Sequence, residues 1–218
     1  MTVTEAGEEK ISFHPILRTA ARLISYVFHP LFIPVYIGWF FINILRLFPQ
    51  LTEWDKTKLL ISFTVNYTVL PLATILLAKG LGFIQSIFLK TQKDRIIPYV
   101  ATGVFYFWIW YVFRSQSFPK EVVMFSLAVF LASSMGLIFN NYLKVSMHAI
   151  SAGVVVALMI LIGFMSENNM GPYISLTVLA AGLVCTARLV TADHYPVEVY
   201  AGLLIGIIAQ ITAYLFVI

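Results

Sequence analysis

Three polar residues near the end of the chain, Arg188, His194 and Glu198, combine the side-chain types of an anion site with an oriented imidazole. The residues around them are almost all apolar, and charged groups near the ends of apolar helices are costly unless they have a function. The guanidinium of Arg188 offers a rigid fork of N–H donors that suits an oxyanion. These residue types therefore point to chemistry on a negatively charged group.

Local helix signals predict how His194 and Glu198 meet. Pro196 is a favourable first residue of a helix, so we expect a helix from about Val197 onward, with Glu198 in its first turn. A carboxylate in that turn can reach back to the imidazole of His194 and orient it. Arg188 ends the preceding helix, which places its donors beside the same turn.

The composition predicts an integral membrane protein. Of the 218 residues, 60% are hydrophobic and 11% are charged, and the mean hydropathy is +0.90. A span needs about 20 apolar residues, so the chain can make six or seven crossings with almost no extramembrane domain. The net charge of +4 is small and no basic patch is interleaved with aromatic residues, which argues against a nucleic-acid partner. The acidic start, residues 1–10, predicts no removable signal peptide.

The whole chain, residues 1–218, is therefore predicted to be a single all-α domain, a polytopic bundle of six to seven transmembrane helices. The expected spans lie at about residues 30–48, 59–79, 98–113, 121–141, 146–165, 173–190 and 196–217. An interfacial amphipathic helix is expected over 11–28, where Arg18 and Arg22 are mixed with apolar residues. Gly202 and Gly206 form a small-xxx-small pattern, which favours close helix packing within the bundle over a dimer interface.

Counting the spans places three polar clusters on one side of the membrane. The segment 90–95 precedes the third span, His148 lies at the start of the fifth, and His194 lies just before the seventh. Two crossings separate each cluster from the next, so all three face the same side. Each cluster also lies where a helix begins, and helix N-termini attract phosphate through free N–H groups and the positive end of the helix dipole. We therefore expect a phosphate site at this face.

These residues resemble the motifs of the type 2 phosphatidic acid phosphatase (PAP2) superfamily, which are Lys-x6-Arg-Pro, Pro-Ser-Gly-His and Ser-Arg-x5-His-x3-Asp. The third motif matches best, since Arg188, His194 and Glu198 have its spacing. Ala187 replaces the motif serine, and Glu198 replaces the motif aspartate. The resemblance spans residues 90–206 and implies a PAP2-like core of transmembrane helices.

The other two motifs are matched in part. The second keeps its serine and histidine as Ser146 and His148 but has Val145 and Met147 in place of proline and glycine. The first motif keeps its lysine and proline as Lys90 and Pro98. Ile97 stands at the position of the motif arginine, and Arg95, two positions upstream, is the candidate to replace it.

The resemblance implies a reaction through a phosphohistidine. His194 would attack phosphorus, while Glu198 would hold the other ring nitrogen and stabilise the imidazolium. His148 would protonate the leaving oxygen and then activate water. Binding of the phosphoryl oxygens would come from Lys90, Arg95, Arg188 and the backbone of Ser146. No cofactor or metal ion is implied, because fixed cations would do the work that Mg²⁺ often does.

The implied partners are membrane lipids and a lipid phosphate substrate of the undecaprenyl diphosphate, phosphatidic acid or phosphatidylglycerol phosphate class. The resemblance also implies a bacterial inner membrane with the site on the periplasmic face. Lysines and arginines divide almost evenly between the two sides outside the expected site, so the positive-inside rule decides nothing.

Other interpretations of the same residues stay open. A non-catalytic lipid-phosphate-binding or scaffolding protein on the same fold would explain the departures at Val145, Met147, Ala187 and Ile97. The cations around residues 79–95 would also suit a loop that grips anionic lipid. A transporter has less support, because no pair of broken helices is indicated at the midplane. His14 and His29 lie outside the resemblance, and no functional role is expected for them.

Overall fold

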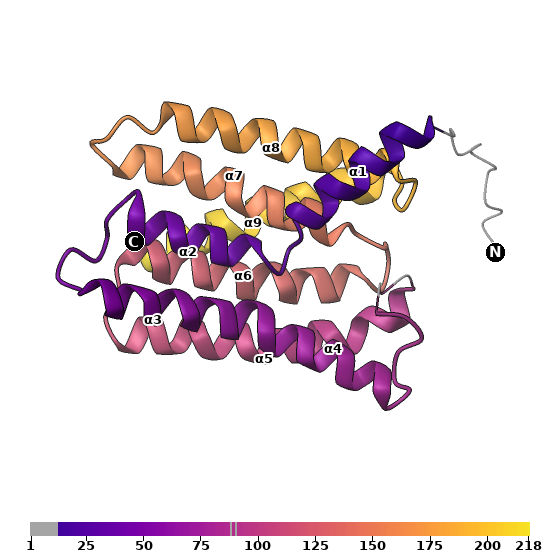
Figure 1. The fold of residues 1–218 in the computed structure, drawn as a ribbon, viewed down its shortest axis with the longest axis horizontal. Coiled ribbons are helices and arrows are strands. Elements are labelled where there is room, and N and C mark those ends of the chain that lie inside the picture. Colours follow the sequence, from indigo (N-terminus) through magenta and orange to yellow (C-terminus); the bar gives the residue numbers. More distant parts are fainter. Residues whose placement is uncertain (1–12, 88, 90) are drawn as a thin grey trace.

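The computed structural model describes residues 13–87, 89 and 91–218, and within this part of the chain it contains helices and no strands (Figure 1). The helices are α1 (Pro15–Val27), α2 (Ile33–Asn43), α3 (Glu53–Thr64), the π-helical turn η1 (Val65–Val69), α4 (Leu70–Gly80), α5 (Gln92–Ser115), α6 (Lys120–Phe139), α7 (Met147–Met165), α8 (Gly171–Val190) and α9 (Pro196–Val217). The segment α3–η1–α4 is one continuous helix, Glu53–Gly80.

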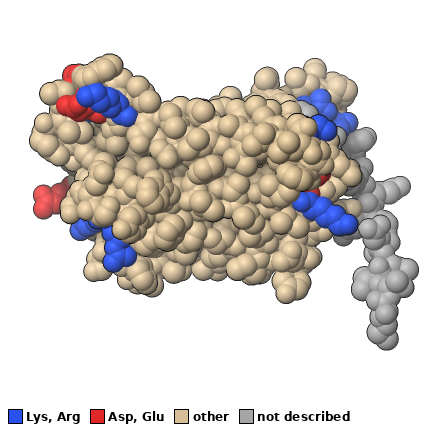
Figure 2. Space-filling view, turned by 90° about the horizontal axis from the view of Figure 1, so that it is seen from below, with Lys and Arg blue, Asp and Glu red and all other residues tan. Residues whose placement is uncertain are grey.

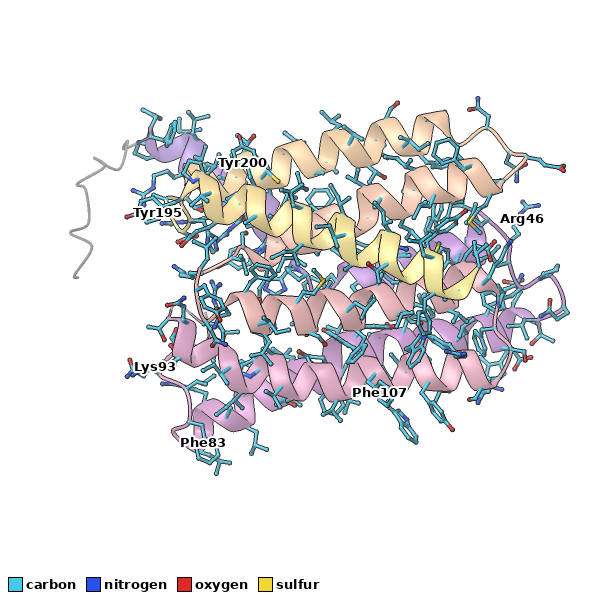
Figure 3. The ribbon with its side chains drawn as sticks, turned by 180° about the vertical axis from the view of Figure 1, so that it is seen from behind. Arg46, Phe83, Lys93, Phe107, Tyr195 and Tyr200 are labelled. Carbon is cyan, nitrogen blue, oxygen red and sulfur yellow. The ribbon has the colours of Figure 1, made fainter. Side chains whose placement is uncertain are left out.

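Six helical segments in the described part of the chain are long and apolar enough to cross a membrane. They are Glu53–Gly80, α5, α6, α7, α8 and α9, and each corresponds to one of the last six expected spans. Charged side chains gather at the two ends of the molecule and leave a broad uncharged belt between them (Figure 2). In Figure 3, Arg46 marks one end and Lys93 the other, while Phe107 points outward from the belt. This distribution is the one that a bilayer requires.

The first expected span, 30–48, is wrong as a complete crossing. The helix in this region, α2, has 11 residues and a length of about 16 Å, which is roughly half of the 30 Å hydrocarbon core. Pro30 explains the break that precedes α2, because the residue before a proline is disfavoured in the helical conformation. The chain therefore leaves α1 at Phe28, turns through 29–32 and begins a new helix at Ile33.

The starts of α5, α7 and α9 lie at the same end of the bundle, as the parity argument predicted (Figure 1). Two hydrogen bonds tie these starts together. The guanidinium Nη1 of Arg95 donates to the carbonyl of Val145 at 2.8 Å, and the N–H of Ser146 donates to the carbonyl of Glu198 at 3.1 Å. The polar clusters at residue 95, at the start of α7 and at the start of α9 are therefore neighbours in space. We call this end of the bundle the site end.

The backbones of α7 and α9 touch through glycines. An added Cβ on Gly206 would collide with the carbonyl oxygen of Ile150, and one on Gly153 would collide with the carbonyl oxygen of Leu203. A Cβ on Gly202 would lie 2.8 Å from the carbonyl oxygen of Ser146. The small-xxx-small prediction is confirmed as packing within the bundle, and this packing sets the distance between the starts of α7 and α9.

Gly206→Ala is expected to lower the free energy of unfolding by about 1–3 kcal/mol, because the new methyl group has no space between the two backbones. The measurement is thermal unfolding in detergent. Gly182→Ala in α8 is the matched control, since an added Cβ there meets no atom within 4 Å and alanine favours the helix. Equal unfolding temperatures for Gly206→Ala and wild type would contradict the close approach of α7 and α9.

The amphipathic helix expected over 11–28 is present as α1, while residues 11 and 12 lie outside the described residues. Its buried residues, Ala21 and Ser25, face inward, and α1 packs against α8 at the site end. Its apolar residues face outward, with Ile16 72% and Leu23 61% exposed. The side of α1 that carries Ala21 and Ser25 therefore packs against the bundle, and an apolar side of α1 is exposed on the surface of the molecule.

Candidate functional site

A cavity of about 630 Å³ runs from the site end into the interior of the bundle. Its wall includes charged residues, histidines and a serine from seven segments, which are Arg22, Ser25, His29, Arg95, Lys144, His148, Arg188, Asp193 and His194. Four of the residues singled out in the sequence, namely Arg95, His148, Arg188 and His194, thus share one cavity. The first and last of them, Arg95 and His194, are 99 positions apart in the sequence.

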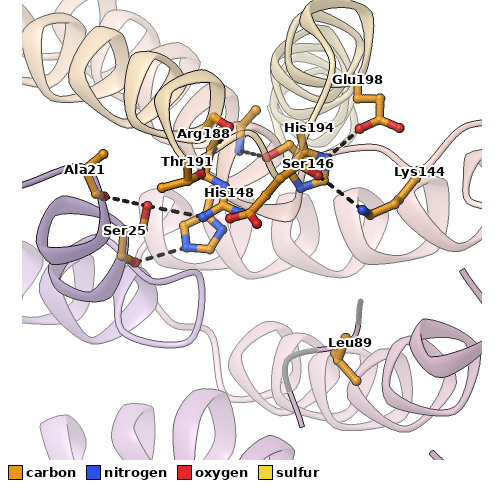
Figure 4. A network of polar contacts seen from close by, with 12 residues as sticks. Ala21, Ser25, Leu89, Lys144, Ser146, His148, Arg188, Thr191, His194 and Glu198 are labelled. Atoms are coloured by element: carbon orange, nitrogen blue, oxygen red, sulfur yellow. Dashed lines mark hydrogen bonds and ion pairs between the residues drawn. The ribbon is translucent and has the colours of Figure 1, made fainter. Parts of the chain in front are cut away.

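His194 lies in the turn between α8 and α9, and Glu198 lies in the first turn of α9, as the proline signal predicted. The Nδ1–H of His194 donates to Oε2 of Glu198 at 2.8 Å (Figure 4). The same oxygen accepts the N–H of Tyr195 at 3.2 Å. Both side chains are buried, with 3% and 9% of their surfaces exposed. The carboxylate therefore fixes the imidazole and leaves Nε2 as the nitrogen that carries the lone pair.

The charges around His194 keep its imidazole neutral. Burial lowers the pKa of His194 well below its ordinary value, and the positive charges of Arg188, Arg95 and Lys144 lower it further. A neutral imidazole with a fixed Nδ1–H is the nucleophilic form of histidine. The same cations that lower the pKa can bind the negatively charged oxygens of a group whose central atom such a nucleophile would attack.

Arg188 lies in the last turn of α8, where its guanidinium is held from two sides. Nη2 pairs with Oδ2 of Asp193 at 2.8 Å, and Nη1 donates to Oγ of Ser25 at 3.2 Å. The buried Nε has no hydrogen-bond partner among the described residues. The two terminal nitrogens of the Arg188 guanidinium are therefore held by hydrogen bonds, while its buried Nε–H group can still donate to an acceptor.

His148 lies in the first turn of α7, which Ser146 caps by accepting the N–H of Ala149 at 3.4 Å. The imidazole Nε2 of His148 lies 3.0 Å from the carbonyl oxygen of Ser25. Because a carbonyl can only accept, Nε2 carries the proton of this hydrogen bond. The ring of His29 packs edge-on against the ring of His148, with centroids 5.2 Å apart.

The structure shows which of the two positions, 95 or 97, faces the cavity. Arg95 is 5% exposed, lines the cavity, and donates from Nε to the carbonyl of Leu89 at 3.0 Å. Ile97 is 37% exposed and is absent from the cavity wall. Two residues correspond to about 200° around a helix, so these side chains point in nearly opposite directions. Arg95 is thus the cation on the cavity side, and Lys90 lies outside the described residues.

The expectation that the backbone of Ser146 binds phosphate is corrected. Ser146 is completely buried and does not line the cavity. Its N–H is already donated to the carbonyl of Glu198, because the glycine contacts bring α9 close to the start of α7. Ser146 therefore acts as the cap of α7 and as a link to α9.

Five residues of this wall were not predicted as site residues from the sequence, namely Arg22, Ser25, His29, Lys144 and Asp193. The side chain of Lys144 donates to the carbonyl of Asp193 at 3.1 Å and adds a cation next to His194. Ser25 and His29 come from α1 and the turn after it, outside the resemblance. Only Pro30 gave a signal, since it predicts a helix end just after these two residues.

In the part of the chain that the structure describes, no group of three or more His, Cys, Asp and Glu side chains is placed to hold a metal ion. The described site contains the imidazoles of His29, His148 and His194 and the cations Arg95, Lys144 and Arg188, and the carboxylate of Glu198 orients His194. Comparisons of the chain with family models, with curated proteins and with solved structures gave no match.

Proposed function

We propose that this protein is an integral-membrane phosphatase that hydrolyses a lipid phosphate or diphosphate through a phosphohistidine on His194. One observation carries the proposal. A buried, neutral imidazole, fixed by Glu198, lies among cations at the polar end of a cavity whose other end is apolar. An anionic head group and a hydrocarbon tail on one molecule match these two ends.

The first step forms the bond between Nε2 of His194 and phosphorus and breaks the bond between phosphorus and the leaving oxygen. Protonated His148 gives its proton to that oxygen, and Glu198 stabilises the imidazolium on the phosphorylated ring. Arg188, Arg95 and Lys144 supply the positive charge that stabilises the transferring phosphoryl group.

The second step returns the site to its starting state. Neutral His148 takes a proton from water, whose oxygen attacks phosphorus while the bond to Nε2 of His194 breaks. Inorganic phosphate leaves, and His148 is protonated again for the next molecule. The sum of the two steps consumes one water and one lipid phosphate and yields an alcohol, or a lipid monophosphate from a diphosphate, and inorganic phosphate.

The apolar end of the cavity suits a hydrocarbon tail. Leu72 of α4, Tyr106 of α5, and Phe125 and Val129 of α6 line it. Tyr106 lies 11 residues beyond Arg95 on α5, a distance of about 16 Å along the helix. The wall residues Leu72 and Phe32 are 43% and 41% exposed, and we infer that the tail enters the cavity sideways from the bilayer at these residues. Candidate substrates are undecaprenyl diphosphate, phosphatidic acid and phosphatidylglycerol phosphate.

Val129→Trp is expected to raise the KM for a long-chain lipid phosphate about tenfold or more, because the indole fills the space of the tail. The KM for a short-chain alkyl phosphate should change less than about threefold. Ile138→Trp on the exposed side of the same helix, where 58% of the isoleucine is accessible, is the matched control. Equal losses for both chain lengths in Val129→Trp would show that the tail does not enter this cavity.

We also place the protein in a bacterial inner membrane, with the site on the periplasmic face. The six apolar helices support a membrane location, and the motif resemblance supports the compartment and the face. Cysteine labelling at Tyr142, which is 84% exposed next to the site end, tests the face. Reaction of Tyr142→Cys in intact spheroplasts with a membrane-impermeant maleimide is the expected result.

A second candidate function is binding of a lipid phosphate without turnover. It is favoured by the four departures from the motifs at Val145, Met147, Ala187 and Ile97. Phosphate release from a panel of lipid phosphates in EDTA separates the two functions. A phosphatase releases phosphate, whereas a binding protein retains the lipid in an Arg188-dependent manner and releases none.

A further inference from the structure

The helix α1 ends with a carbonyl group that its own backbone does not use. The carbonyl of Ser25 belongs to the last turn, where an α-helix leaves its oxygens without N–H partners. In a continuing helix the N–H of His29 would donate to it. That N–H lies 3.3 Å from the carbonyl of Tyr26 instead, because Pro30 keeps His29 out of the helical conformation.

His148 supplies the missing donor from a position 123 residues away, with Nε2 3.0 Å from this oxygen. The charged and titratable groups that face His148 are Arg188 of α8, His29 of the turn after α1, and His194. None of them is an anion, and no carboxylate contacts His148 among the described residues. Among the described residues, the negative pole in contact with this imidazole is therefore the C-terminal end of α1, where the helix dipole places partial negative charge.

We propose that the C-terminal end of α1, through the carbonyl of Ser25, positions His148 and stabilises its protonated form, as Glu198 does for His194. The proposal rests on the proposed function and names Ser25 as a positioning residue for the general acid. Because Nε2 is held by the carbonyl, proton exchange with the substrate occurs at Nδ1 of His148. The two histidines thus work through opposite nitrogens, Nε2 of His194 and Nδ1 of His148.

The hydroxyl group of the same serine extends this role to Arg188. Oγ of Ser25 donates to the carbonyl of Ala21 at 2.9 Å and accepts Nη1 of Arg188 at 3.2 Å. One residue of α1 thus orients both the proton donor and a phosphate-binding cation. The outward apolar side of α1 keeps this helix in place in an apolar environment, with Ile16 and Leu23 largely exposed.

The proton transfers balance at Nδ1. In the first step the Nδ1 proton of the imidazolium moves to the leaving oxygen, while the Nε2–H bond to Ser25 is kept. In the second step Nδ1 takes a proton from the water that attacks phosphorus. Loss of the Ser25 contact should therefore slow the protonation of a poor leaving group and also slow hydrolysis of the phosphohistidine.

The variant Pro30→Ala tests the role of the Ser25 carbonyl. Without the proline, His29 can enter the helix, and its N–H then competes with His148 for this carbonyl. For a long-chain alkyl phosphate we expect kcat to fall about 10- to 100-fold with KM changed less than about threefold. With an alkyl-substituted nitrophenyl phosphate, whose leaving group needs no proton, phosphohistidine should accumulate. The control is Leu23→Ala on the exposed side of α1, which should behave like wild type.

A purely structural role of α1 would lower the turnover of both substrates equally, without phosphohistidine, and would overturn the proposal. A second measurement needs no variant. In nitrogen-15 NMR of histidine-labelled wild type, neutral His148 should carry its proton on Nε2 and His194 on Nδ1. An Nδ1–H tautomer of His148 would overturn the proposal. Wild type that releases no phosphate would refute the proposed function as well, whereas active wild type with an unaffected Pro30→Ala would refute only the role of α1.

Discussion

His194→Gln is expected to abolish phosphate release from a lipid phosphate, with kcat reduced about 10⁴-fold or more. The imidazole Nε2 is the proposed nucleophile, and glutamine offers no comparable lone pair at that position. The measurement is release of inorganic phosphate by purified protein in detergent and EDTA. His14→Gln is the matched control, because His14 is exposed at the start of α1 and lies outside the cavity wall.

Glu198→Gln is also expected to reduce phosphate release. The carboxylate accepts Nδ1–H of His194 at 2.8 Å, and an amide there removes the charge that stabilises the phosphorylated imidazolium. We expect kcat to fall about 10²- to 10⁴-fold, with a smaller change in KM. Wild-type turnover in either His194→Gln or Glu198→Gln would remove this pair from the reaction and would favour a site that only binds.

Arg188→Ala is expected to lower kcat/KM about 10²- to 10³-fold, which is the usual loss when one donor to a developing oxyanion is removed. Its side chain is only 12% exposed, and its fork is preoriented by Asp193 and Ser25. Arg188→Lys should recover a small part of the activity, because an ammonium group supplies charge without the planar fork. Steady-state kinetics over a range of lipid phosphate concentrations provide the measurement.

Arg114→Lys is the control for Arg188→Lys. Arg114 is exposed in the last turn of α5, at the end of the bundle opposite to the site, so its replacement should leave the kinetics unchanged. If Arg188→Ala kept wild-type kcat/KM, the guanidinium would be an anchor for Asp193 and for lipid headgroups. The proposed phosphate site would then lose its best oriented cation.

Much of the fold could be predicted because long apolar runs and helix signals are local. The last six spans follow from such runs, and parity then places the starts of α5, α7 and α9 together. Glu198 was predicted in the first turn of α9 from Pro196 alone, and its bond to His194 follows from that short separation. The prediction of the first span was wrong because α1 ends just before Pro30 and α2 is too short to cross the membrane.

The rest of the site depends on contacts that no local pattern contains. The bond from His148 to Ser25 joins residues 123 positions apart, and that from Arg188 to Ser25 joins residues 163 positions apart. The N–H of Ser146, expected to bind phosphate, donates instead to the carbonyl of Glu198, because glycines bring α7 and α9 together. Helix periodicity predicts that Arg95 and Ile97 point to opposite sides of their helix, but only the assembled bundle shows that the side of Arg95 faces the cavity.

Trapping of the phosphoenzyme tests the central claim most directly. Purified wild type is mixed with a radioactively labelled lipid phosphate in EDTA, quenched at alkaline pH to preserve a phosphorus–nitrogen bond, digested and analysed by mass spectrometry. We predict a single acid-labile phosphate on His194, formed within one turnover and absent from His194→Gln. Turnover of the lipid by wild type without any phosphate on His194, or with phosphate on another residue, would contradict the proposed mechanism.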